Sequence, residues 1–240
     1  KFLSDDFCHY FYPEIKSFFE TSKKDDEEIS DEYIACFNIV KSGIDQSFLD
    51  NFEEKRQEGE NESYLCSLIR KDSVIEFISH VNRKQISLSK SKIQTSYFDT
   101  NSFLIHKEPS FIEYAAFYGS IQIFQYLIKN EVELSSSLWI YSIHSNNPSL
   151  IHILEENQII PDDKTYYKCY KESVKCHHND FANYFKINYF VKDIFSYKFH
   201  FHNYEQIPSN INKEKILYSL IKYDYLDLLK ILLKTEEIDF

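Results

Sequence analysis

PSFIEYAAFYGSIQIFQYLIKN, residues 109–130, contains the clearest structural signal in the chain. Apolar residues recur at intervals of three and four on both sides of Gly119, as they do on the buried faces of two amphipathic helices. The small pair Ala115–Ala116 lets two helices approach closely, and Gly119 can adopt the left-handed conformation of a tight turn. Ser110 and Glu113 have the spacing of a capping box at the start of the first helix. The stretch therefore predicts a helix, a turn and a second helix that lies back on the first.

The same arrangement recurs along the chain. Further turns are predicted near Asp72, Asn146, His177 and Asp224, so that with Gly119 the turn residues lie 47, 27, 31 and 47 positions apart. A serine stands nine residues before three of the five turns, at Ser63, Ser110 and Ser137. The predicted helix pairs span about residues 62–81, 109–130, 136–156, 164–186 and 212–234. We therefore predict an all-α fold of stacked antiparallel helix pairs with an irregular period.

Residues 62–240 resemble the divergent ankyrin-type domain of unknown function that occurs in very large numbers in a parasitic protist. The resemblance lies in four phrases: EPSFIEYAAFYGSIQIFQYLI (108–128), LWIYSIHSNNPSLIHILEEN (138–157), ESVKCHHNDFANYF (172–185) and LDLLKILLKTEEID (226–239). It implies an ankyrin-like helical solenoid, although the period differs from the 33 residues or so of an ordinary ankyrin array. It implies no reaction, because no activity is established for that domain.

The chain divides into two predicted parts. Residues 1–61 alternate aromatic helical runs with charged breaks and are interpreted as an N-terminal helical capping segment. Residues 62–240 are the predicted repeat domain, with inserted loops at 82–108 and 188–210. The chain contains no methionine and begins with Lys1. We therefore expect it to be a piece of a longer chain, with further ankyrin repeats following it as the resemblance implies.

Composition excludes several classes of protein. With 3 glycines and 5 prolines in 240 residues, the chain has too few turn residues for a β-sandwich or barrel. The formal charge of −11 opposes binding to nucleic acid or to an anionic membrane surface. Five scattered cysteines are interpreted as free thiols, which predicts an intracellular, cytoplasmic location. No small-molecule substrate is identified.

Two groups of residues have side chains that metals prefer. The first offers two thiols and two imidazoles, at Cys169, Cys176, His177 and His178. Its spacing is wrong for a zinc finger, and the two adjacent histidines occupy a predicted turn. The second, His200 and His202, lies in an aromatic loop in which ordinary histidines are expected. We predict no metal site and no cofactor.

Catalytic motifs are missing from the sequence. Gly43, Gly59 and Gly119 are too far apart to form a phosphate-binding glycine loop or a nucleophile elbow. The carboxylate pairs Glu155–Glu156 and Asp162–Asp163 are interpreted as solvated charges. A Cys/His-dependent hydrolase or transferase site stays open as an alternative, centred on residues 169–178, because catalytic partners can be distant in sequence.

The predicted partner-binding face lies on the first helix of each pair. Its members are Arg70, Tyr114, Phe117, Tyr118, Tyr141 and His144, with Lys71 and Lys175 extending its basic ends. Tyrosine and arginine are frequent at binding hot spots. In the alternative interpretation, the aromatic residues pack beneath the inserted loops as core. Trp139 is predicted to be core.

The leading functional hypothesis is a non-catalytic protein-interaction or scaffolding module that binds an unknown protein through this concave helix face and the loops. The alternatives are the Cys/His-dependent enzyme domain and an inert capping segment for further ankyrin repeats beyond residue 240.

Overall fold

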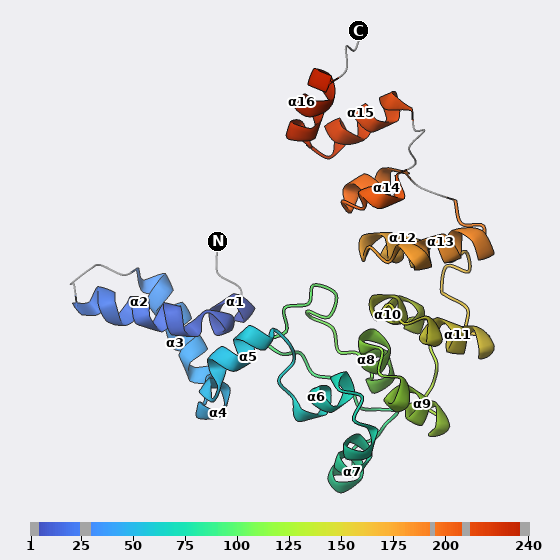
Figure 1. Cartoon of the computed structure of the whole chain (residues 1–240). Helices are drawn as coiled ribbons and strands as arrows, with labels where there is room; N and C mark the ends of the chain where they lie inside the picture. Colours follow the sequence, from blue (N-terminus) through green and yellow to red (C-terminus); the bar gives the residue numbers. More distant parts are fainter. Residues whose placement is uncertain (1–4, 25–29, 193–194, 208–211, 236–240) are drawn as a thin grey trace. The chain divides into compact units, whose positions relative to one another are not determined.

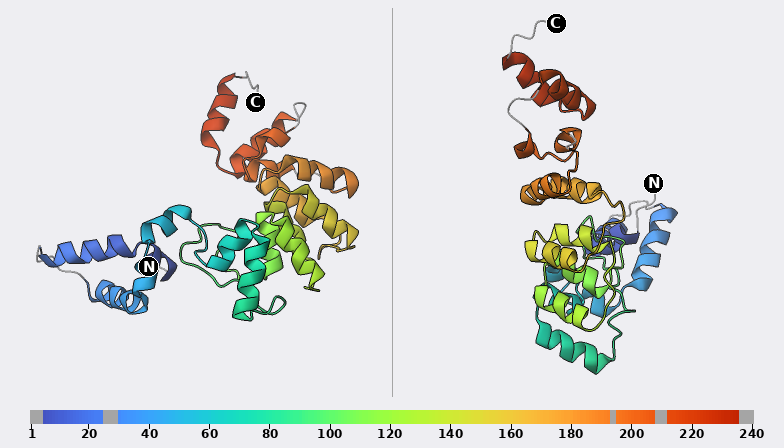
Figure 2. Two further views of the ribbon diagram at one scale, coloured as in Figure 1. Left: turned by 60° about the horizontal axis from the view of Figure 1, so that its bottom comes forward. Right: turned by 90° about the vertical axis from the view of Figure 1, so that its right-hand side faces the viewer.

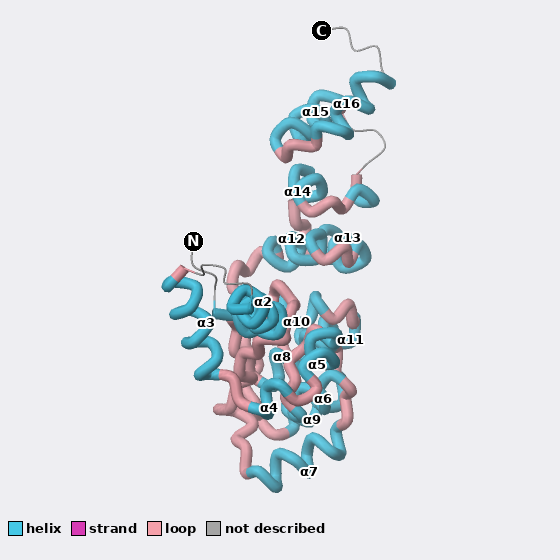
Figure 3. Tube along the Cα trace, turned by 90° about the vertical axis from the view of Figure 1, so that its left-hand side faces the viewer, coloured by secondary structure: helices cyan, strands magenta, loops and turns pink. Residues whose placement is uncertain are grey.

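The computed structural model describes residues 5–24, 30–192, 195–207 and 212–235 (Figure 1). These ranges contain helices, turns and loops but no strand, so the all-α prediction is confirmed (Figure 3). An isolated antiparallel bridge joins Lys92 to Ser110. None of the helices in the described ranges combines the length and apolar character needed to cross a lipid bilayer.

The chain forms two compact units. The first comprises residues 1–68 and 90–110, and the second comprises residues 69–89 and 111–240. The boundary falls within α6 (Tyr64–Arg70), seven residues after the predicted boundary at position 61. Residues 90–110, which the sequence assigns to an insertion in the repeat domain, belong to the first unit.

The first unit consists of short helices around an aromatic core. Its helices before α6 are α1 (Asp5–Tyr10), α2 (Tyr12–Lys24), α3 (Asp31–Gly43), α4 (Gln46–Leu49) and α5 (Phe52–Glu58). Segment 90–110 belongs to this unit and buries three of its apolar residues, Ile93, Phe98 and Leu104. The ring of Phe98 is fully buried and lies 5.1 Å from the ring of Phe48 and 5.2 Å from that of Phe52.

Helix pairs follow one another through the rest of the chain. They are α6 with α7 (Val74–Lys84), α8 (Phe111–Tyr118) with α9 (Ile121–Lys129), α10 (Leu138–His144) with α11 (Pro148–Glu156), α12 (Tyr167–Lys175) with α13 (Asn179–Asn188), and α15 (Lys213–Lys222) with α16 (Leu226–Thr235). Their bounds agree closely with those of the five predicted pairs.

Every predicted turn residue has a positive φ. The values are 49° at Asp72, 73° at Gly119, 52° at Asn146, 61° at His177 and 59° at Asp224. In the second, fourth and last pairs, the residue that follows the turn residue donates its backbone N–H to the carbonyl five residues earlier. In the second pair, for example, Ser120 donates to Ala115 at 2.9 Å. This is the Schellman arrangement that ends a helix at a left-handed residue.

The segment predicted as an aromatic insertion at 188–210 contains a shorter version of the same turn. Helix α14 (Phe195–His200) is followed by His202, whose φ is 56°, and then by the one-turn helix η1 (Tyr204–Gln206). The N–H of Asn203 bonds to the carbonyl of Lys198 at 2.8 Å, five residues earlier. This pair could not be predicted from the sequence, because α14 and η1 are both too short to show helical periodicity.

A second left-handed residue follows the second helix of four pairs. These residues are Gln85, Glu131, Gln158 and Phe190, with φ between 52° and 57°. An apolar residue comes next in each case, at Ile86, Val132, Ile159 and Val191. The pairs therefore share two left-handed positions, although most of these positions are not glycine.

Replacing Gln158 by Gly is expected to raise the free energy of unfolding by about 0.5–1 kcal/mol. Gln158 is exposed and has a φ of 56°, which costs an L-residue energy that glycine avoids. The matched variant Gln125→Gly, at an exposed position within α9, should instead lower it by about 1 kcal/mol. Urea unfolding followed by circular dichroism measures both, and equal signs would contradict the assignment of a left-handed residue at 158.

The first helices of successive pairs pack against one another. Helix α8 contacts α10, α10 contacts α12, α12 contacts α14, and α14 contacts α15 (Figures 1 and 2). Ala115 and Ala116 on α8 are completely buried, as expected for residues at a close helix contact. This succession brings residues at equivalent positions of neighbouring first helices together.

Turn residues also hold neighbouring pairs together. Both carboxylate oxygens of Asp72 accept backbone hydrogen bonds, from the N–H groups of Gln122 and Ile123 at 2.9 Å each. These are otherwise unpaired donors at the start of α9, so Asp72 caps the second helix of the next pair. The Ser120 hydroxyl returns a bond to the carbonyl of Ile69 at 2.6 Å.

Candidate functional site

Five of the six residues predicted to bind a partner form a continuous row within the second unit. Arg70 Nη1 donates to the Tyr114 hydroxyl at 3.2 Å, and the Arg70 guanidinium lies 6.0 Å from the ring of Tyr118. The Tyr118 ring lies 5.0 Å from that of Phe117. The Phe117 ring in turn stacks on His144 at 5.0 Å. The row crosses from α6 through α8 to α10, as the repeat register predicts.

Most of the aromatic side chains in this face are buried. Tyr114 is 1% exposed, Phe117 7% and Tyr141 8%, whereas Tyr118, Arg70 and His144 are partly exposed. These three aromatic residues are therefore core. The alternative interpretation placed them beneath the inserted loops, whereas Tyr114 and Phe117 contact Arg70 of α6 and His144 of α10. Their side chains pack between helices. Helical periodicity alone does not show whether such side chains are covered by a neighbouring helix or exposed to solvent. Only the edge of the row is accessible to a partner.

Tyr141 lies beside a carboxylate that joins two pairs. The Ser137 hydroxyl, at the N-cap position of α10, makes no capping hydrogen bond with its own helix and donates instead to Glu113 Oε1 of the preceding pair at 2.5 Å. Burial, together with the nearby Glu113 charge, raises the pKa of Tyr141 to about 12. The phenol therefore stays neutral in the folded protein well above its usual pKa.

Tyr141 should make the protein sensitive to alkali. Between pH 10 and 12 the unfolded chain loses the Tyr141 proton while the folded chain retains it, so folding stability falls as pH rises. Between pH 9 and pH 11, the wild type should lose about 1–1.5 kcal/mol more than Tyr141→Phe. Urea unfolding at the two pH values measures the difference. Equal losses in the two proteins would show that Tyr141 does not ionise in this range.

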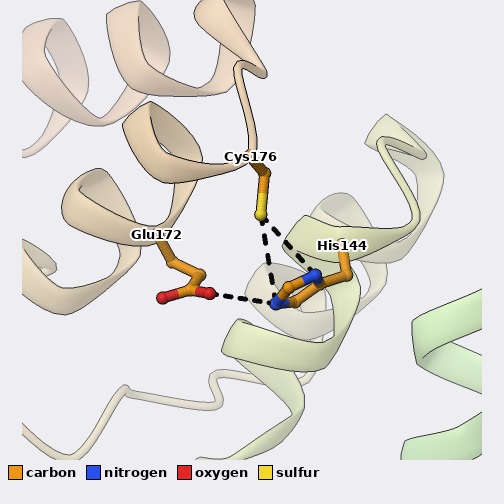
Figure 4. A group of neighbouring side chains, drawn as sticks. All are labelled: His144, Glu172 and Cys176. Atoms are coloured by element: carbon orange, nitrogen blue, oxygen red, sulfur yellow. Dashed lines mark hydrogen bonds and ion pairs between the residues drawn. The ribbon is translucent and has the colours of Figure 1, made fainter. Parts of the chain in front are cut away.

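Beyond Phe117, the row ends at a cluster of His144, Glu172 and Cys176 (Figure 4). His144 Nε2 lies 3.0 Å from Glu172 Oε1, and its Nδ1 lies 3.5 Å from Cys176 Sγ. Lys175, expected at the basic end of the face, has its ammonium group 3.0 Å from the same Glu172 oxygen. The side chains of His144 and Glu172 are only 12% and 16% exposed.

Local structure explains the meeting of these residues. His144 is the last residue of α10, and Glu172 and Cys176 are four residues apart at the end of α12, so they share one face of that helix. Because α10 packs against α12, the imidazole reaches both groups.

The cluster shifts the acidity of its members. Burial pushes the pKa of Glu172 upward, but hydrogen bonds from His144 and Lys175 outweigh this effect and leave the pKa below its usual value. Burial and the Glu172 charge raise the pKa of the Cys176 thiol to about 12. The negative end of the α12 dipole adds to this effect, since Cys176 caps the carboxyl end of the helix. Without a metal ion, the carboxylate is charged and the thiol is protonated at neutral pH.

Neither the Cys169–His178 group nor the His200 and His202 pair comes together as a set of metal ligands among the described residues. Cys169 is completely buried, and His177 Nε2 lies 2.8 Å from the carbonyl of Phe201. Burial lowers the pKa of His178. In the second group, His202 Nδ1 lies 3.2 Å from the hydroxyl of Tyr225, whereas the His200 ring lies 5.1 Å from that of Tyr223.

The sequence indicates Cys176 as a candidate ligand and His144 as a candidate contact, but it singles out neither Glu172 nor the meeting of the three residues. The signal was present in the repeat register. His144 lies two residues before its turn, while Glu172 and Cys176 lie five and one before the next turn. Residues near the ends of successive first helices meet when those helices stack.

A cavity of about 330 Å³ lies between α11 and α13. Its lining is mostly apolar and includes Ile151 and Phe181. The carboxylate of Glu155 in its wall accepts hydrogen bonds from the hydroxyls of Tyr184 and Tyr189. The Glu155 carboxylate is therefore already engaged, and His152 and Asp180 also line this mostly apolar cavity.

Comparison of the chain with models of known protein families, with curated proteins and with solved structures finds no match.

Proposed function

We propose that the helix pairs form a divergent ankyrin-like solenoid that binds a protein partner and performs no chemistry of its own. One observation carries the proposal. The five turn residues picked out by the repeat register all adopt the left-handed conformation, and a second left-handed residue follows the second helix in four of the pairs. Repeated pairs of this kind present a continuous surface made of equivalent positions, which repeat proteins use for binding.

The proposed contact surface is the accessible edge of the first-helix row. Its buried aromatic residues form a rigid floor, while Tyr118 and Arg70 are partly exposed and Lys71 and Lys175 are exposed. A rigid floor lowers the entropic cost of binding, and tyrosine with arginine supplies contact area and hydrogen bonds. The loops that join successive pairs extend the surface.

An affinity capture experiment tests this surface. The immobilised chain is incubated with lysate from its own source, and the proteins that it retains are quantified. The measurement is made with the wild type and with the double variant Tyr118→Ala, Lys71→Glu. The proposal predicts at least one protein whose recovery falls about tenfold or more in this variant. The matched double variant Gln125→Ala, Lys129→Glu changes exposed residues of α9, the second helix of its pair. It should recover the same protein as the wild type does.

Recovery of no protein above background would contradict the binding proposal and favour the capping alternative. Equal loss in both double variants would contradict the assignment of the surface. Far-ultraviolet circular dichroism of each variant checks that the helices are intact.

A thiol-dependent enzyme is a second candidate, favoured by one observation. Cys176, His144 and Glu172 lie in the order nucleophile, base and orienting carboxylate, with separations of 3.5 Å and 3.0 Å. The raised pKa of Cys176 opposes it, because catalytic cysteines need an accessible thiolate. We expect Cys176 to react with iodoacetamide at pH 7 more slowly than a free cysteine. Faster reaction in the folded protein would favour the enzyme.

The proposal includes an intracellular location, which the state of the cysteines supports. Among the described residues, Cys8, Cys66, Cys169 and Cys176 form no disulfide, as expected in a reducing compartment. The formal charge of −11 continues to favour a protein partner over nucleic acid.

A further inference from the structure

We propose that His144, Glu172 and Cys176 bind a divalent transition-metal ion of the zinc class, which joins the third and fourth helix pairs. This inference goes beyond partner binding and does not depend on it. Within the described residues, these three form a group whose imidazole, carboxylate and thiol ligand atoms all lie within 4.8 Å of one another.

The separations between the ligand atoms are close to those around a tetrahedral ion. Ligand atoms bound to zinc at about 2.0–2.3 Å lie about 3.3–3.8 Å apart. In the cluster, His144 Nε2 is 3.0 Å from Glu172 Oε1 and 4.0 Å from Cys176 Sγ. Small side-chain rotations would bring both separations into the tetrahedral range. The nitrogen that faces the carboxylate is therefore the proposed ligand (Figure 4).

The ligand set selects the class of metal. One thiolate, one imidazole and one carboxylate match the donors that zinc accepts, whereas magnesium and calcium prefer oxygen ligands alone. On binding, the Cys176 thiol gives its proton to solvent and its sulfur bonds to the ion, while His144 binds as the neutral imidazole. The charges of thiolate and carboxylate balance the 2+ charge of the ion. A water molecule would complete the fourth position.

Packing around the cluster supports a preformed site. Glu172 and Cys176 come from the same face of α12, and Phe117 stacks on the His144 ring at 5.0 Å with an interplanar angle of 29°. Lys175 contacts Glu172 Oε1 at 3.0 Å and can keep the carboxylate oriented. Because α10 supplies one ligand and α12 supplies two, a bound ion would cross-link neighbouring pairs.

Cobalt titration of the reduced, metal-free chain tests the proposal. Co²⁺ bound by a thiolate produces a charge-transfer absorption band in the near ultraviolet. We expect this band to saturate at one ion per chain and to disappear when Zn²⁺ is added. Zn²⁺ should also raise the Tm and release protons from the wild type at neutral pH.

Variants identify the ligands. Cys176→Ser should abolish the band, and His144→Gln and Glu172→Gln should each weaken binding by about tenfold or more. Cys169→Ala and His152→Gln are matched controls, because Cys169 lies on the same helix without joining the cluster and His152 is an exposed histidine on α11. Both controls should keep the band.

Several results would overturn the proposal. They are the absence of a thiolate–cobalt band in the wild type, a band that survives in Cys176→Ser, and a band that is lost in Cys169→Ala but kept in Cys176→Ser. Weak metal binding shared equally by all variants would show adventitious binding only. If Cys176→Ser does not fold, the weakened binding of His144→Gln and Glu172→Gln decides the question, and unchanged affinity in both overturns it.

Discussion

Replacing Trp139 by Ala is expected to lower the free energy of unfolding by about 3–5 kcal/mol. Trp139 is completely buried, as predicted from its position in the helix, and its indole N–H donates to the carbonyl of Ile159 at 2.9 Å. Its ring lies 5.1 Å from that of Tyr166 and 6.1 Å from that of Phe185. The change therefore opens a cavity between the third and fourth pairs and leaves a carbonyl without its donor.

Two variants separate these effects. Trp139→Phe keeps a ring and loses the hydrogen bond, so it should cost less than the alanine variant, about 1–3 kcal/mol. Ile160→Ala, at a residue 59% exposed, should change stability by less than about 0.5 kcal/mol. Trp139 is the only tryptophan in the chain, so urea unfolding must be followed by circular dichroism. A cost below about 1 kcal/mol for Trp139→Ala would contradict its place in the core.

Replacing Gly119 by Ala is expected to cost about 1–3 kcal/mol. The φ of 73° is unfavourable for any side chain, and a β-carbon at this position would lie 3.3 Å from Cβ of Ser145 in the next pair. The backbone carbonyl of Gly119 also lies 3.5 Å from the Asn147 side-chain amide, so a shift would disturb the contact between pairs.

Gly43→Ala provides the matched control. Gly43 ends helix α3, its nearest neighbour for an added β-carbon is His9 Nε2 at 3.6 Å, and its φ is not in the left-handed region. Alanine there should leave stability unchanged or raise it by up to about 1 kcal/mol. Urea unfolding compares the two variants. Equal effects at Gly43 and Gly119 would show that the turn does not require a left-handed residue.

The helices and turns of the second unit could be predicted because their signals are local. The Ala115–Ala116 pair, Gly119 and the flanking apolar periodicity define a helix–turn–helix without information from the rest of the chain. Alignment of other segments with Gly119 then predicts turns at Asp72, Asn146, His177 and Asp224, where no glycine marks them. Left-handed Asp and Asn are common enough for this extension to succeed.

Long-range contacts could not be predicted in the same way. Helical periodicity predicts that Tyr114 and Phe117 point outward from their own helix pair. It does not predict whether a neighbouring helix covers them. Similarly, Phe98 gives no local sign that it belongs with Phe48 of the first unit. Glu172 was missed because a single glutamate on a helix is usually a solvated charge, and its meeting with His144 depends on how α10 and α12 pack.

The central claim is that one turn geometry repeats along the chain in the predicted register. Nuclear magnetic resonance of the isotope-labelled chain measures it most directly, through scalar couplings and Cα chemical shifts that report φ. We predict positive φ at the five turn residues, Asp72, Gly119, Asn146, His177 and Asp224, with helical shifts on both sides of each. A helix that continues through one of these positions, or an extended conformation there, would contradict the repeat register and the binding face built on it.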